Sequence, residues 1–112
     1  MIYEVSKTPP TVNSMYAMNR RSGGKDRRRS PQYDTWLALA IQEIKGKVKP
    51  IHDAPYALII HVSDKARGDV DGYIKGCVDL LVKLGATPDD RKMFVVTAKK
   101  SPIKGVRIEV LQ

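Results

Sequence analysis

The sequence predicts an α/β protein of the α+β type: a single two-layer domain over residues 1–112, with one mixed sheet and helices packed on it. A nearly continuous apolar run at 56–63 is typical of an inner strand, whereas 106–110 alternates between apolar and polar residues. Two segments with apolar residues at helical spacing separate the strands. The expected order is strand, helix, strand, helix, strand, strand, and the length suits one core.

The first strand is expected at residues 2–6, where it ends before the consecutive prolines Pro9 and Pro10, which supply no backbone donors. Residues 8–30 are rich in Asn, Ser, Gly and Arg, and they predict a long basic loop. Tyr16 in this loop is placed either to stack on an unpaired base or to pack beneath the loop.

Ser30 and Pro31 predict a helix start, because serine can cap a helix and proline suits the first helical position. Gly46 is the expected stop. The apolar face of this helix should consist of Tyr33, Leu37, Ala40, Ile41 and Ile44. Trp36 is off this face, which predicts a dimer contact or a partly buried surface residue.

The second half should hold a central strand at 56–63 that is buried on both faces, and a helix from about Asp69 to Leu84 that ends at Gly85. The expected buried face of this helix is Val70, Ile74, Cys77, Val78, Leu81 and Leu84. Strands at 93–97 and 106–110 follow, joined by a turn at 101–105.

The charge balance predicts a polyanionic partner. The chain has 20 Lys and Arg against 12 Asp and Glu, a net charge of +8. This surplus suits nucleic acid or an anionic membrane, but no apolar run approaches the roughly 20 residues that span a bilayer. The sole cysteine, Cys77, lies on an apolar helical face, so we expect a core residue in a protein of the reducing cytoplasm.

Basic residues are concentrated in the loop that precedes the first helix. A solvated loop is the simpler explanation, but the arginine density favours contact with phosphates. The expected DNA-binding residues are Arg20, Arg21, Lys25, Arg27, Arg28, Arg29, Arg67, Lys100 and Lys104.

Carboxylates in so basic a chain need an explanation. Asp69 should cap the second helix and Asp71 lies in its first turn, so both can be structural, each worth about 0.3–1 kcal/mol through the helix dipole. Lys75 is four residues beyond Asp71, the spacing of a surface salt bridge. A divalent cation between the carboxylates is the chemical alternative. Asp90 precedes the next strand, so only the three-dimensional arrangement or a partner subunit brings it beside Asp69.

The segment 67–75, followed by Asp79, Gly85, Asp89 and Asp90 and by the terminal strands, resembles the RusA family of Holliday junction resolvases over about residues 64–110. These are small homodimeric endonucleases of bacteria and their phages that act in DNA recombination and repair. The resemblance implies paired nicks in four-way DNA junctions, with Mg²⁺ as the cofactor or Mn²⁺ in its place. It also implies a metal site of Asp69, Asp71 and Asp90, with Lys75 as the catalytic lysine.

Two positions depart from the family pattern. Gly72 stands where the family usually has asparagine, and Gly68 stands where it often has arginine, with Arg67 one place earlier. The ligand set is intact, so these changes bear on substrate preference and activity level. Two other functions fit the sequence. One is a basic nucleic-acid-binding protein without catalysis, and the other is a nuclease that acts on forks or flaps.

Overall fold

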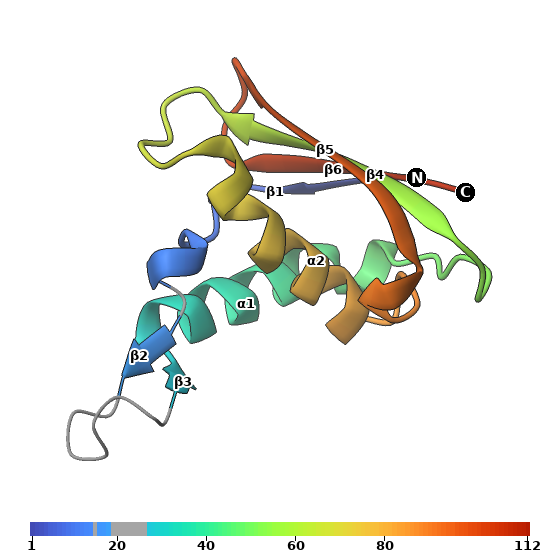
Figure 1. The fold of residues 1–112 in the computed structure, drawn as a ribbon, viewed down its shortest axis with the longest axis horizontal. Coiled ribbons are helices and arrows are strands. Elements are labelled where there is room, and N and C mark those ends of the chain that lie inside the picture. The colour runs from blue at the N-terminus through green and yellow to red at the C-terminus, as the bar shows by residue number, and fades with distance from the viewer. Residues whose placement is uncertain (15, 19–26) are drawn as a thin grey trace.

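The computed structural model describes residues 1–14, 16–18 and 27–112, and it confirms one mixed sheet with helices packed on it. The sheet has four strands in the order β1 (Ile2–Val5), β6 (Val106–Leu111), β4 (Tyr56–Ser63) and β5 (Met93–Ser101). Helices α1 (Pro31–Ile44) and α2 (Ile74–Lys83) lie together beneath one face of this sheet (Figure 1). Among the described residues, no helix is long and apolar enough to cross a membrane.

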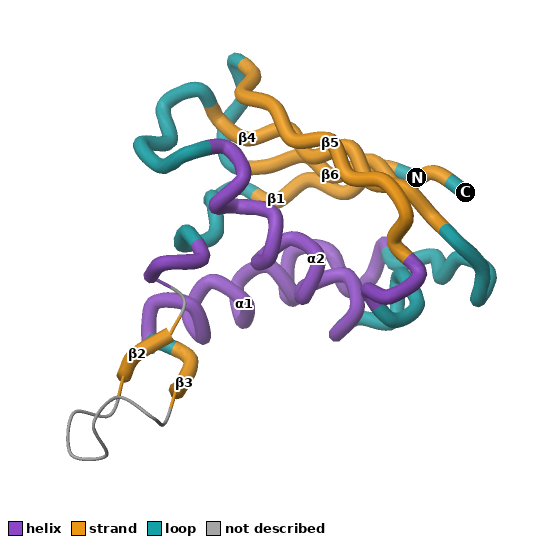
Figure 2. The backbone as a smooth tube through the Cα atoms, viewed as in Figure 1, coloured by secondary structure: helices purple, strands orange, loops and turns teal. Residues whose placement is uncertain are grey.

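The central strand β4 pairs in parallel with β5 and antiparallel with β6. Its side chains alternate between buried and half-buried, so the prediction that both faces are buried is wrong. The buried set comprises Tyr56, Leu58, Ile60 and Val62, which face the helices, and the half-buried set comprises Ala57, Ile59 and His61. The helices cover only one face (Figure 2), so an apolar run was an unreliable sign of burial on both sides.

Helix α1 begins as predicted. The Ser30 hydroxyl oxygen accepts a hydrogen bond from the backbone N–H of Tyr33 at 3.2 Å and donates to the carbonyl of Ser14 at 2.9 Å. A 3-10 turn, η3 (Lys45–Lys47), ends the helix around Gly46. Trp36 is buried, which corrects its assignment to the surface, because its indole N–H donates to the carbonyl of Lys7 at 2.8 Å.

The described residues of the segment 8–30 are not all loop, which is a further correction. It contains a 3-10 turn, η1 (Val12–Ser14), and a short antiparallel hairpin of β2 (Tyr16–Met18) and β3 (Arg27–Arg29). The hairpin extends away from the sheet beyond the start of α1 (Figure 1). Arg20, Arg21 and Lys25 lie outside the described residues. An all-arginine strand has no apolar alternation, so the sequence pattern did not predict it.

The second helix begins later than predicted. A 3-10 segment, η4 (Val70–Tyr73), precedes α2, so Asp69 and Asp71 lie before the α-helix rather than in its first turn. The buried residues of α2 are Gly76, Cys77, Val78, Leu80 and Leu81. Burial raises the pKa of the Cys77 thiol to about 12, as befits a core residue rather than a nucleophile. Gly85 ends the helix with a positive φ of 72°, as expected of a glycine stop.

The two helices and the proline segment meet at Gly76. A Cβ atom at this position would lie 2.8 Å from Cβ of Pro9 and 3.8 Å from Cζ3 of Trp36. The absence of a side chain at Gly76 therefore lets residues 7–11 pass between α1 and α2.

We expect Gly76→Ala to destabilise the protein although alanine favours a helix. The added methyl group must displace Pro9, an overpacking cost of about 1–3 kcal/mol, against a gain of roughly 1 kcal/mol from helix propensity. Urea unfolding should therefore give a net loss of up to about 2 kcal/mol. Gly46→Ala is the control, because no atom lies within 4 Å of its added Cβ. Gly76→Ala at or above parental stability would contradict the packing described here.

Candidate active site

Two carboxylates lie exposed just beyond the carboxyl end of β4. Asp69 precedes η4 and Asp71 lies within it. Asp69 has the cap position, but its side chain makes no capping hydrogen bond. Within the described part of the chain, neither carboxylate has a hydrogen bond or an ion pair. The structural roles that the sequence offers for these two acids are therefore not observed.

Lys75 does not form the predicted salt bridge with Asp71. Its Nζ donates instead to Oδ1 of Asp79 at 3.1 Å, one turn further along α2. Oδ2 of Asp79 accepts a hydrogen bond from the hydroxyl of Tyr33 at 2.9 Å. The cause is the 3-10 segment, because its three residues per turn rotate Asp71 off the α-helical face that carries Lys75.

Asp90 lies at the opposite end of α2 from Asp69 and Asp71. It opens a 3-10 turn, η5 (Asp90–Lys92), that leads into β5. The ten residues of α2 separate the two positions, a rise of about 15 Å. With Asp79 and Asp89, Asp90 lines a separate cavity of about 320 Å³ against α1. Among the described residues, no three His, Cys, Asp or Glu side chains are placed to hold one metal ion.

The carboxylate of Asp89 accepts hydrogen bonds from the neighbouring residue Arg91. The backbone N–H of Arg91, at 2.9 Å, together with the Arg91 side chain and Asp90, holds the pKa of the Asp89 carboxyl below its usual range. Nearby, burial raises the pKa of Tyr56, and the negative charges of Asp90 and Asp89 add to this effect. Asp89 is therefore a charged turn residue at neutral pH, whereas Tyr56 keeps its proton.

Basic side chains gather at the same end of the sheet as Asp69. The backbone N–H of Asp64 donates to the carbonyl of Ser101 at 2.9 Å, so the loop after β4 and the end of β5 are adjacent. Lys100 Nζ donates to the carbonyl of Ala66 at 2.6 Å and ties β5 to this loop. Arg67 in the loop and Lys104 in the β5–β6 turn are exposed. Three of the expected DNA-binding residues thus share this end with the carboxylates.

Asp69 and Asp71 fit the requirements of Mg²⁺ in part. This ion is usually held by one or two protein carboxylates, several waters and the phosphates of the substrate. An exposed carboxylate pair without hydrogen bonds to described residues offers such a partial set, and a phosphate can complete it. Asp90 does not join the set within one copy of the chain.

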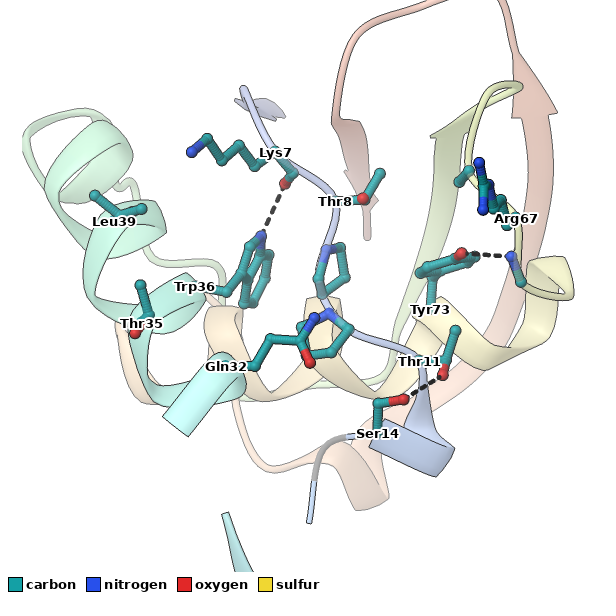
Figure 3. A pocket seen from close by; sticks show the side chains of 14 residues that line it. Lys7, Thr8, Thr11, Ser14, Gln32, Thr35, Trp36, Leu39, Arg67 and Tyr73 are labelled. Carbon is teal, nitrogen blue, oxygen red and sulfur yellow. Dashed lines mark hydrogen bonds between the residues drawn. The ribbon is translucent and has the colours of Figure 1, made fainter. Parts of the chain in front are cut away.

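A cavity that sequence reasoning missed opens beside Gly68 (Figure 3). The backbone N–H of Gly68 donates to the hydroxyl of Tyr73 at 2.8 Å. A Cβ atom at Gly68 would lie 2.5 Å from Cγ2 of Thr11 and 2.7 Å from the Tyr73 hydroxyl. Glycine therefore lets the loop before Asp69 rest directly on the cavity wall. The glycine at position 68, which departs from the pattern that the chain resembles, was the signal that could have drawn attention to this close approach.

Comparison with known proteins does not assign the chain to a family. No family model matches the chain, and no curated protein matches it. The resemblance to the RusA family therefore depends on the residues that carry it.

Proposed function

We propose that the chain is a Mg²⁺-dependent endonuclease of branched DNA, with the four-way junction as its substrate, as its resemblance to the RusA family implies. The observation that supports this most is the carboxylate pair Asp69 and Asp71, exposed and without partners among the described residues. In a chain of net charge +8, such a pair repels a phosphate backbone unless a cation lies between them. Metal-dependent phosphodiester hydrolysis uses that arrangement.

Each group of residues in the proposed site has a separate role. Asp69 and Asp71 would hold the ion, which would supply charge neutralisation at the scissile phosphate and a bound water. Lys75 stabilises negative charge on the phosphate oxygens during cleavage. Its side chain is partly exposed and is held by Asp79, which the Tyr33 hydroxyl fixes in turn. The basic residues Arg67, Lys100 and Lys104 receive the DNA backbone at the same end.

Asp90 acts in this proposal from a second copy of the chain. Within one copy α2 separates it from the carboxylate pair by about 15 Å, so a shared site needs Asp90 of the partner subunit. A two-fold homodimer would then carry two equivalent sites, as paired nicks in a two-fold junction require. Such an enzyme would act in the cytoplasm of a bacterium, whether the host or a phage encodes it.

A non-catalytic DNA-binding protein is the second candidate, favoured by the arginine strand β3. It needs neither the carboxylates nor a metal ion. Cleavage in the presence and absence of Mg²⁺ therefore separates the two candidates, and a panel with forks and flaps separates the junction from other branched substrates.

We expect Asp71→Asn to lower junction cleavage by about a hundredfold or more, because it removes a carboxylate from the ion. Binding should persist or strengthen, since a repulsive charge is lost. A labelled four-way junction and a matched linear duplex, each with Mg²⁺ or with chelator, measure both. Glu4→Gln is the matched control, since this exposed carboxylate on β1 pairs with Arg107 of β6 at 3.0 Å, and neither strand carries a residue of the proposed site. Full activity in Asp71→Asn would exclude the proposed ligand set.

The shared site makes a separate prediction for mixed dimers. Asp71→Asn and Asp90→Asn should each be inactive alone. When they are mixed and allowed to exchange subunits, one site of each mixed dimer regains Asp71 from one copy and Asp90 from the other. The mixture should therefore nick the junction on one strand. If each copy held a complete site of its own, no mixture would recover activity.

The arginine strand makes a third prediction. Replacing Arg27, Arg28 and Arg29 together by Gln should weaken binding to all DNA and lower the slope of log K against log salt by up to about 3. Replacing Lys45, Lys47 and Lys49 by Gln removes the same charge from exposed positions beyond the end of α1. Equal effects of the two triple variants would show that β3 contributes only to the net charge.

A further inference from the structure

A cavity of about 480 Å³ lies next to the carboxylate pair, and the proposed function gives it no role. Three separate segments form it: residues 7–14, the first half of α1, and the loop 66–68 with Tyr73 (Figure 3). Its volume is within the range of about 300–1,000 Å³ that is typical of ligand sites. It contains neither Asp69, Asp71 nor Lys75, although Gly68 on its wall directly precedes Asp69.

The apolar part of the wall is rigid. Pro9, Trp36 and Tyr73 are buried. The indole N–H of Trp36 donates to the carbonyl of Lys7 at 2.8 Å, so the ring cannot rotate without losing this bond. The hydroxyl of Tyr73 accepts from Gly68, which fixes the second ring. The cavity is thus pre-formed, although Trp36 and Tyr73 are each only 5% exposed and little of either ring is open to an occupant.

The charged part of the wall is entirely positive. Lys7 lies on the α1 side of the cavity and Arg67 on the η4 side (Figure 3), and no acidic residue is among the described residues that line it. Neither cation has an ion pair with a described residue. The remaining polar side chains are neutral hydroxyl and amide groups: Thr8, Thr11, Ser14, Gln32 and Thr35.

The occupant that fits this wall has a flat ring with hydrogen-bonding edges and a negative charge on each side. A nucleotide within a strand has this chemistry, because a phosphate flanks its base in both directions. We propose that the cavity binds one unpaired nucleotide of the DNA, with its base in the cavity and its phosphates at Lys7 and Arg67. This inference rests on the proposed function, since it concerns the strand that reaches Asp69.

Such a site would favour branched DNA over a linear duplex. A base in a duplex is stacked and paired, so bringing it into the cavity costs a few kcal/mol, whereas a base beside a branch point is released at lower cost. The position agrees with this role. Ser14 lines the cavity and its carbonyl accepts the hydroxyl of Ser30, so the arginine hairpin starts from the cavity rim. A strand held there passes from the hairpin to the carboxylate pair.

The cavity has a built-in reporter, because Trp36 is the sole tryptophan of the chain. We would titrate the Asp71→Asn protein with a single-stranded thymidine tetranucleotide in chelator and follow tryptophan emission. A saturable change is expected. Lys7→Gln with Arg67→Gln should weaken binding about tenfold at low salt, since two phosphate contacts are lost. Lys45→Gln with Lys47→Gln is the control of equal charge, at exposed positions beyond the end of α1.

A blocking variant tests the cavity rather than its charge. Thr35 is exposed on α1 and lines the cavity, so Thr35→Phe fills it from the rim without entering the core. Loss of the emission change in this variant would support the proposal. The proposal would be overturned if the Asp71→Asn protein gave no emission change. It would also be overturned if the Lys7 and Arg67 pair weakened binding no more than the Lys45 and Lys47 pair. If the unmutated protein cleaves junctions but the titration gives no emission change, the proposed nuclease function is retained and the nucleotide site is rejected. If the emission changes but the unmutated protein does not cleave, the nucleotide site is retained and the nuclease function is rejected.

Discussion

The parallel pairing of β4 with β5 is the constraint on which the candidate site depends. Parallel neighbours cannot be joined by a tight turn, so the chain must return along the length of the sheet before the second strand begins. Here α2 is that return. It leaves from the carboxyl end of β4 with Asp69 and Asp71, and it arrives at the amino end of β5 with Asp90. The same pairing that builds the core therefore separates the acids that the resemblance groups together.

The return helix is held by close packing, to which the hydrogen bond from Tyr33 of α1 to Asp79 of α2 adds. Gly76 gives Pro9 room to enter between α2 and α1, and the indole of Trp36 closes the same gap. Because residues 7–11 are drawn in at this point, they pass beside the loop that carries Gly68 and form the cavity wall with it. Core packing and the proposed nucleotide site thus share residues. A substitution at Trp36 would disturb both the core packing and the proposed nucleotide site. Substitutions at exposed residues on the cavity rim therefore test the site without altering the core.

Local signals in the sequence predicted most of the fold. Ser30 and Pro31 fixed the start of α1, and Gly85 the end of α2, since caps and stops depend on a few adjacent residues. The burial of Trp36 was not predictable from helical periodicity, because its partner is the carbonyl of Lys7, 29 residues away. Likewise, a capping aspartate suggested a continuous helix from Asp69, whereas the chain forms a 3-10 segment first. The distance from Asp69 to Asp90 could not be predicted either, because it depends on the parallel pairing of β4 with β5.

At Gly68, where the family that the chain resembles often has arginine, the fold leaves no room for a side chain. An arginine at this position would have to displace Thr11 and the Tyr73 hydroxyl, because even a Cβ atom comes within 2.7 Å of both. In this chain the backbone of Gly68 bonds to Tyr73, and the positive charge is carried one residue earlier by Arg67 on the cavity wall. Compared with the pattern that the chain resembles, the cation stands one residue earlier, on the wall of an adjacent cavity. A strand bound there would be positioned by a base in the cavity as well as by its phosphates, which ties recognition of unpaired DNA to the fold around Asp69.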